Sequence, residues 1–319
     1  MVAYQTAYFK CHFPREYMAA LLTSVLDNSD KVSGYIGECR ECGIALLPPD
    51  INRSADRFTV EEGGIRFGLV AIKNIGRGFI QAVMRERETG GDFTSLYDFC
   101  SRMNGSEMNK RAVENLIRSG AFDSMGARRS QLIKVYETVM DSVAAQQRDN
   151  VEGQMDFFSM AAGFADKPEP VKEIPLPDIP EYTPEELMTM EKATTGLYLS
   201  GHPMDHYRDA VRKLHAPTIV SIIEDFSREN GPERFTDGQR ITIAGVITSS
   251  KTKTTKNNSL MAYVMVEDDT ASMELLCFSR VLETCGAYMK ENQAVVVKGR
   301  LSVRDEKAPQ ITVSYTHLT

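Results

Sequence analysis

Two groups of residues in this chain have types and spacings that could support chemistry. Cys39 and Cys42 are separated by two residues, which is the spacing of zinc ligands. One such pair supplies half of a tetrahedral site, and no second Cys-x-x-Cys or spaced His pair follows at a suitable distance. A metal-dependent enzyme centred on these thiols would carry stoichiometric zinc. We favour the alternative of two ordinary helical thiols and expect no metal site.

The second group predicts a phosphate-binding turn. Residues 72–83 have the layout of a helix, a tight turn and a second helix, which is typical of a helix-hairpin-helix unit. Such a turn presents backbone N–H groups at a helix N-terminus, where a DNA phosphate can bind. Asn74 replaces the first turn glycine of that motif and tolerates a left-handed backbone. The residues expected to contact duplex DNA here are Lys73, Asn74, Gly76, Arg77 and Gly78.

A second, looser unit follows at residues 109–123 and adds Lys110 and Arg111 to the expected duplex contacts. Residues 66–130 contain eleven basic and seven acidic residues, whereas the whole chain has a net charge of −7. A positive block in an acidic chain favours contact with phosphates. A plain helical bundle with a solvated charged face is the alternative.

A short docking motif is expected between two parts of the chain. Residues 151–198 contain ten acidic and three basic residues and six prolines, a composition that favours an extended tether. Adjacent aromatics in a tether typically insert into a partner's pocket. The alternative is that they fold back onto the preceding helix as a local cap. The motif consists of Gln154, Met155, Asp156, Phe157 and Phe158.

The last block of the sequence predicts a β-barrel of the OB type. Strands are expected at residues 241–247, 260–266, 271–278 and 294–301, with a short helix at 281–289 before the fourth strand. That fold binds single strands on its face and loops. The residues expected to do so are Lys251, Lys253, Lys256, Tyr263 and Phe278. Alternation alone leaves open whether the two aromatics instead lie in the core.

Length and composition set the remaining expectations. A chain of 319 residues fits two or three domains. Its N-terminus lacks a signal-peptide layout, and its six cysteines are scattered, which suits a reducing compartment. We therefore expect a cytoplasmic protein.

The order of these blocks resembles the C-terminal half of the alpha subunit of bacterial DNA polymerase III. The resemblance covers nearly the whole chain and rests on several quoted segments. They are residues 3–10, 18–22, 47–52, 67–73 and 109–111, followed by 120–123, 153–156 and 199–203. It implies a multidomain α+β protein: a helical remnant of the polymerase fingers, a tandem helix-hairpin-helix bundle, an acidic linker and an incomplete OB-fold barrel.

The expected domains follow from that resemblance. They are 1–64 (end of the fingers), 65–146 (tandem helix-hairpin-helix), 147–182 (acidic linker with a clamp-binding motif), 183–238 (helical connector), 239–312 (truncated OB fold) and 313–319. The last seven residues resemble one reading frame of a transposase adapter used in sequencing libraries, so we expect them to be a non-native tail.

The resemblance also implies partners and an activity. The partners are duplex and single-stranded DNA, a sliding clamp that binds residues 154–158, and other replicase subunits. The polymerising aspartates and their magnesium ions belong to a palm domain expected upstream of Met1. We therefore expect no catalytic residue and no cofactor in this fragment, which should be inactive alone. The alternative is a non-catalytic DNA-binding adaptor of repair or recombination.

Overall fold

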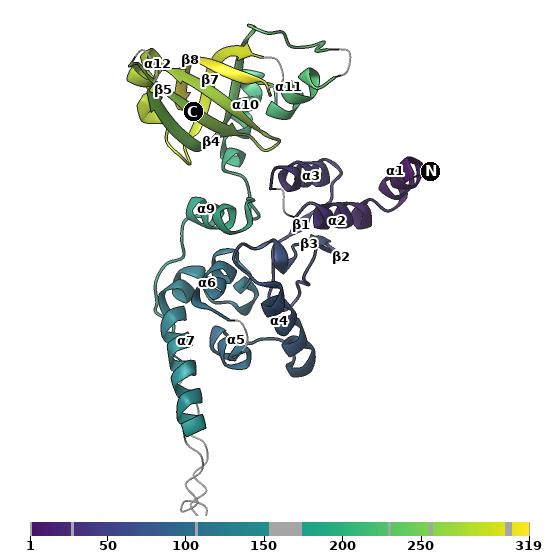
Figure 1. The fold of residues 1–319 in the computed structure, drawn as a ribbon, viewed down its shortest axis with the longest axis vertical. Helices are drawn as coiled ribbons and strands as arrows, with labels where there is room; N and C mark the ends of the chain where they lie inside the picture. The colour runs from purple at the N-terminus through teal and green to yellow at the C-terminus, as the bar shows by residue number, and fades with distance from the viewer. Residues whose placement is uncertain are drawn as a thin grey trace, which may run out of the picture. The chain divides into compact units, whose positions relative to one another are not determined.

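The computed structural model describes residues 2–26, 29–105, 108–152, 174–228, 231–254, 258–303 and 308–318. The chain divides into two compact units (Figure 1). The first comprises residues 1–26 and 42–200, and the second comprises residues 27–41 and 201–319. The finer domain boundaries expected from the sequence stay predictions. None of the helices within the described ranges combines the length and the apolar character needed to cross a membrane.

The first unit is mainly helical. Its helices are α1 (Val2–His12), α2 (Pro14–Ser24), α4 (Arg77–Gly90), α5 (Leu96–Met103), α6 (Lys110–Arg118), α7 (Arg129–Glu152) and α9 (Pro184–Thr195), with the one-turn 3-10 helices η1 (Leu69–Ala71) and η2 (Asp123–Met125). A three-stranded sheet joins β1 (Leu46–Leu47) parallel to β3 (Gly64–Arg66), and β3 antiparallel to β2 (Thr59–Glu61). The strands β2 and β3 form a β-hairpin.

The core of this helical bundle is built on aromatic rings. Phe99 of α5 is fully buried and makes edge-to-face contacts with three other phenylalanines. Its ring centroid lies 6.2 Å from that of Phe79, 5.0 Å from that of Phe93 and 5.1 Å from that of Phe122. Because these rings come from α4, α5 and the segments around them, one cluster holds the elements of both hairpin units together.

Local sequence signals explain several helix ends. Thr183 and Glu186 form a capping box at the start of α9, with Pro184 at the first helical position. Ser95 caps α5 and Asn109 caps α6 by accepting a backbone N–H in the first turn.

The acidic linker has structure at both of its ends. Residues 147–152 continue α7, and residues 174–182 run back along that helix. Gln131 Nε2 donates to the Pro177 carbonyl at 2.8 Å, and Arg128 Nη1 donates to the Ile179 carbonyl at 2.7 Å. The last part of the segment expected to be a solvated tether is therefore held against the helical bundle. The docking motif, residues 154–158, lies outside the described residues.

The second unit contains a five-stranded barrel (Figure 1). Its helices are α3 (Ser29–Glu41), α10 (Arg208–Leu214), α11 (Ile219–Phe226) and α12 (Ser279–Cys285), with the 3-10 helices η3 (Pro203–Tyr207) and η4 (Gly286–Tyr288). Its strands are β4 (Arg240–Thr254), β5 (Leu260–Glu267), β6 (Ser272–Phe278), β7 (Ala294–Ser302) and β8 (Gln310–Leu318). The four predicted strands and the helix between the third and the fourth are present.

The barrel is closed, so the expectation of an incomplete barrel is wrong. The strand order is β4-β5-β6-β8-β7, and β7 pairs with β4 to complete the ring. The closing strand is β8, which runs antiparallel to β7 and parallel to β6. Residues 313–318, expected to be a non-native tail, form most of β8. Ile311 and Val313 are buried in the barrel core with residues from the other four strands. Whether residues 313–319 are native stays a prediction.

Candidate nucleic-acid interface

The turn before α4 has the backbone that a phosphate-binding hairpin requires. Asn74 adopts a left-handed conformation with φ of 62°, as its position in the motif predicts. Gly76 is extended, with ψ of 145°, and no side chain caps the helix that begins at Arg77. Asn74, Gly76, Arg77 and Gly78 are all exposed. The first backbone N–H groups of α4 are therefore accessible beside a guanidinium group. The element before the turn is the one-turn η1 instead of a full helix.

Lys73 is anchored to the C-terminal end of α9. Its backbone N–H donates to the Thr194 carbonyl at 2.8 Å, and its Nζ donates to the Ala193 carbonyl at 3.0 Å. Its own carbonyl accepts from Asn115 Nδ2 at 2.6 Å. These contacts fix the backbone at the entrance of the turn. The amine that the sequence assigns to phosphate binding thus also stabilises the last turn of α9.

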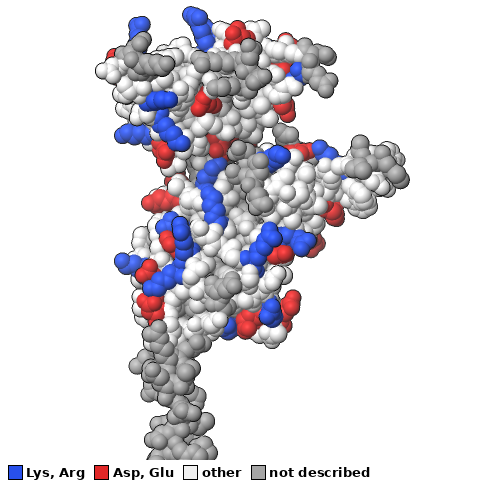
Figure 2. Space-filling view, viewed as in Figure 1, with Lys and Arg blue, Asp and Glu red and all other residues white. Residues whose placement is uncertain are grey.

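The second hairpin unit, residues 109–123, presents less unpaired positive charge than the turn before α4. Lys110 Nζ lies 3.0 Å from Asp141 and 3.8 Å from Glu137, both on α7, and the hydrogen bond to Asp141 is the main cause that raises the pKa of this amine. Arg111 beside it is exposed. In the face drawn in Figure 2, Lys and Arg side chains of the helical unit lie next to Asp and Glu side chains. Lys110 would have to exchange a carboxylate for a phosphate, whereas Arg111 needs only to turn toward it.

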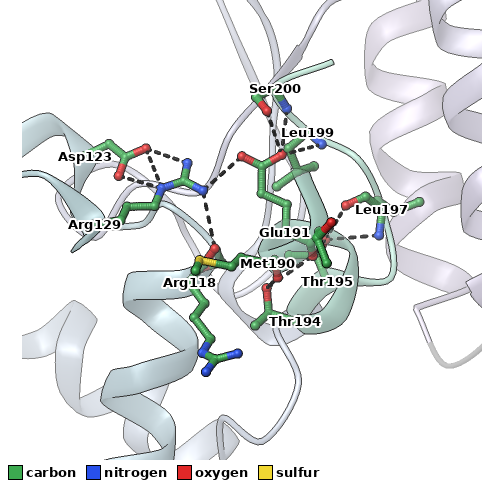
Figure 3. Close-up of polar contacts among 12 residues, drawn as sticks. Arg118, Asp123, Arg129, Met190, Glu191, Thr194, Thr195, Leu197, Leu199 and Ser200 are labelled. Carbon is green, nitrogen blue, oxygen red and sulfur yellow. Dashed lines mark hydrogen bonds and ion pairs between the residues drawn. The ribbon is translucent and has the colours of Figure 1, made fainter. Parts of the chain in front are cut away.

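A buried ion cluster holds α9 (Figure 3), and the C-terminal end of this helix contacts Lys73 at the entrance of the turn before α4. Glu191 is 1% exposed, and its carboxylate accepts from Arg129 Nη1 at 3.0 Å. The other oxygen accepts from the backbone of Leu199 and from both the backbone and the hydroxyl of Ser200, at 2.9 to 3.0 Å. Asp123 contacts the opposite edge of the same guanidinium. Burial lowers the pKa of Arg129, but its two carboxylates outweigh burial and raise it.

Sequence reasoning missed this cluster because its members are far apart in the chain. Glu191 and Arg129 are separated by 62 positions and belong to α9 and α7. The signal that was present is Gly120, which has φ of 84° and whose missing Cβ leaves room for the Arg129 guanidinium. A conformation that favours glycine beside a turn indicates close packing there, although it does not say what packs.

On the barrel, the expected single-strand residues share one outer surface. Lys251 of β4 is the cross-strand partner of Tyr263 on β5. Lys253 is opposite Met261, which is opposite Phe278 on β6. Paired residues point to the same side of a sheet. The neighbours of these residues on each strand, such as Ala262 and Cys277, belong to the barrel core.

Lys251, Lys253, Met261, Tyr263 and Phe278 therefore form one outer surface, which we call the aromatic face. Phe278 is 46% exposed, Tyr263 is half-buried, and neither belongs to the barrel core. Lys251 and Lys253 are both exposed, near the end of β4. Lys256 lies outside the described residues. The arrangement combines π-faces with positive charge, which is what stacking on a single strand requires.

The two cysteines with metal spacing lie at the end of α3. Cys39 is buried and Cys42 is exposed. Within the described ranges, no group of three or more His, Cys, Asp or Glu side chains is close enough to hold a metal ion. The buried thiols of Cys100 and Cys277 have a pKa raised to about 12 by burial, as expected of unreactive core cysteines.

Comparison with known proteins agrees with both parts of the fold. A family model described as a helix-hairpin-helix motif matches residues 43–132, and one described as an OB-fold nucleic acid binding domain matches residues 241–318. The fold class predicted from the sequence is thus confirmed, apart from the completeness of the barrel.

Nearly the whole chain also matches one curated protein from several bacteria. It is 33% identical over 96% of its length to the DNA polymerase III subunit alpha of Vibrio cholerae serotype O1, and 37% identical over 96% to that of Saccharopolyspora erythraea. The match to the Mycobacterium tuberculosis protein is 34% over 99%. The chain spans about a quarter of the length of these relatives. The resemblance expected from the sequence is confirmed.

Proposed function

Because nearly the whole chain is similar to about a quarter of the alpha subunit of bacterial DNA polymerase III, we propose that it is a DNA-handling part of a replicative DNA polymerase. The identity of 33 to 37% over almost the full length of the chain is the observation that carries this proposal. The exposed turn before α4 and the aromatic face on the barrel support it independently, because each suits a different form of DNA.

Duplex DNA would bind at the turn before α4. A phosphate there accepts hydrogen bonds from the first N–H groups of α4 and is neutralised by Arg77, with Lys73 nearby. Arg111 and Lys110 would contact a second phosphate. These contacts involve only the backbone of the DNA, so binding should be independent of sequence and should weaken as salt rises. A polymerase needs this kind of grip, because it must hold every sequence that it copies.

Single-stranded DNA would bind on the aromatic face. Tyr263 and Phe278 would each stack on a base, and Lys251 and Lys253 would contact phosphates, with Lys256 as a further expected phosphate contact. We also propose that residues 154–158 tether the protein to a sliding clamp. Phe157 and Phe158 would fill a pocket of the clamp, and Gln154 and Asp156 would fix the pose by hydrogen bonds, with Met155 as the remaining residue of the motif. Tethering raises the effective concentration of DNA near the enzyme and so increases processivity.

The polymerisation step itself would be carried out by the longer protein, in the cytoplasm and together with other replicase subunits. Magnesium ions would supply its phosphoryl-transfer chemistry, held by palm carboxylates that we expect outside this chain. We therefore propose no catalytic role for any residue of this chain. A primer-extension assay with magnesium tests that statement, since incorporation of nucleotides by the isolated chain would contradict it.

The first test is DNA binding by fluorescence anisotropy with labelled oligothymidylate and a labelled hairpin duplex. Replacing Tyr263 and Phe278 together by alanine should weaken single-strand binding by about 1 to 3 kcal/mol for each lost stacking contact. Duplex binding should be unchanged. The matched control is Tyr288→Ala, because Tyr288 is an exposed aromatic residue of the same unit that lies outside these strands. Equal single-strand affinities of the double variant and this control would refute the assignment of the aromatic face.

The clamp proposal has its own test. A peptide or the full chain with Phe157→Ala and Phe158→Ala should lose several kcal/mol of affinity for a purified bacterial sliding clamp, on the order of other interface hot spots. Ser159→Ala is the matched control in the same segment. Unchanged clamp binding by the double aromatic variant would exclude the motif.

A further inference from the structure

An apolar groove lies on the helical unit, between α5, the start of α7 and the end of the linker. Its volume is about 240 Å³. A cavity of about 150 Å³ holds a benzene ring, so this groove is large enough for an aromatic side chain. We call it the α7 groove. Its apolar lining includes the buried residues Leu96, Leu132, Val135 and Val139, together with Ile174 and Leu176.

The α7 groove is uncharged. Each described residue that lines it is apolar or neutral, and the polar ones are Thr94, Ser95, Tyr97 and Gln131. Burial of an unpaired charge is costly, so a charged side chain is disfavoured in such a cavity. The occupant should therefore be an uncharged segment that offers a large apolar side chain.

The chain itself contains such a segment beside the groove. Residues 153–173, which lie outside the described residues, connect Glu152 at the end of α7 to Ile174 in the wall of the groove. Nine consecutive residues of this connection, 157–165, are uncharged. The next eight residues, 166–173, contain five charges and therefore suit a path in solvent. The large apolar side chains of the uncharged run are Phe157, Phe158, Met160 and Phe164.

Chain length favours Phe164 among these side chains. Val139 lies 13 residues before Glu152 on α7, which corresponds to about 20 Å of helix. Phe157 and Phe158 follow Glu152 by only five and six residues, which span at most about 18 and 21 Å when fully extended. The reversal of direction after α7 uses part of that length. Phe164 follows Glu152 by 12 residues, which span up to about 40 Å, and thus reaches the buried wall of the groove.

We propose that the α7 groove binds the connecting segment of this chain, with Phe164 as the side chain that fills it. Burial of one phenylalanine side chain contributes a factor of about 10 or more to the docking equilibrium. Docking divides the connection into two shorter segments, residues 153–163 and 165–173. A shorter tether raises the effective concentration of a partner bound at residues 154–158. This last consequence rests on the proposed clamp tether, whereas the docking does not.

The test uses tryptophan fluorescence of the full chain, because the sequence contains no tryptophan. Phe164→Trp and Phe157→Trp each introduce a single reporter. The Phe164→Trp variant should emit at a shorter wavelength, and acrylamide should quench it several-fold less than the Phe157→Trp variant. Emission and quenching of the Phe164→Trp variant equal to those of free N-acetyltryptophanamide would overturn the inference. The same conclusion follows if only the Phe157→Trp variant is protected, because the clamp motif would then be the occupant.

A second substitution tests where the reporter is buried. Leu176 lines the α7 groove and is 44% exposed, so Leu176→Glu adds a charge there with little effect on the core, which thermal melting checks. Combined with Phe164→Trp, it should return the emission and the quenching to exposed values. The matched control is Leu214→Glu, because Leu214 is 42% exposed and belongs to α10 of the other unit. Equal effects of the two glutamate substitutions would overturn the inference, since the reporter would then be buried elsewhere.

Dilution distinguishes the segment of the same chain from that of a second copy. Docking within one chain does not depend on protein concentration, so the emission of the Phe164→Trp variant should stay unchanged on dilution. A shift toward exposed values would identify a second copy as the source of the occupant and would overturn the inference. The clamp proposal is tested separately, because its readout is the clamp affinity of the variant with Phe157→Ala and Phe158→Ala.

Discussion

Replacing Glu191 by alanine should destabilise the helical unit more than any other single charge removal in α9. The carboxylate is 1% exposed and accepts hydrogen bonds from Arg129, Leu199 and Ser200. Its loss leaves the buried Arg129 guanidinium, whose side chain is 7% exposed, with Asp123 as its remaining charged partner. Removing one partner of a buried pair typically costs about 3 to 5 kcal/mol. Asp123 still compensates part of the Arg129 charge, but the backbone N–H groups of Leu199 and Ser200 also lose their acceptor, so we expect a loss within that range.

The magnitude converts into a measurable melting shift. A unit of this size, residues 1–26 and 42–200, loses about 2 to 4 °C of melting temperature for each kcal/mol. The first unfolding transition in differential scanning calorimetry should therefore fall by about 6 to 20 °C in the Glu191→Ala variant. The barrel transition should stay where it is. Glu191→Gln keeps the side-chain shape and one acceptor oxygen, so this variant should lose less melting temperature than Glu191→Ala.

The matched control is Glu185→Ala, which removes an exposed carboxylate from the first turn of the same helix. That change should cost about 0.5 kcal/mol through the helix dipole. The reasoning is refuted if the unfolding free energies of Glu191→Ala and the control differ by less than about 1 kcal/mol, because the ion cluster would then contribute no more to stability than a surface charge does. A second readout is duplex DNA affinity. Since the end of α9 holds Lys73 at the turn, Glu191→Ala should weaken duplex binding and Glu185→Ala should not.

Three further outcomes are expected. Asn74→Gly should be tolerated and Asn74→Ala should unfold about 1 to 2 kcal/mol more easily than the glycine variant in urea, because φ of 62° is strained for a side chain that cannot bond its own backbone. Burial raises the pKa of Glu181, but three backbone N–H groups, two of them at the start of α7, outweigh burial and lower it. Its contribution to stability is therefore present above the unfolded pKa of about 4.3 and is lost as pH falls through the lower folded value, so Glu181→Gln should flatten the acid side of the stability curve measured by circular dichroism. Asp268→Ala should lower the free energy of unfolding of the barrel by about 1 to 3 kcal/mol, because it leaves the buried N–H of Ile219 without its acceptor. Asp269→Ala, which changes an exposed neighbour, should leave the unfolding free energy of the barrel unchanged.

The parts of this structure that the sequence predicts are those set by local chemistry. The capping box at Thr183 and the left-handed Asn74 each depend on one to four consecutive residues. The first four barrel strands follow from alternation within single segments, and the helix before the fourth follows from a change of period. The exposure of Phe278 could not be predicted in the same way, because alternation divides a strand into two faces without saying which face is wet.

The features that the sequence does not predict arise where distant segments meet. The sequence of β8 alone did not lead us to predict a strand. This segment forms a strand because its backbone N–H and C=O groups pair with the two open edges that β6 and β7 present. Residues 174–182 have the composition of a solvated tether, yet Glu181 and Pro177 are held by α7 through a helix N-terminus and a side-chain amide.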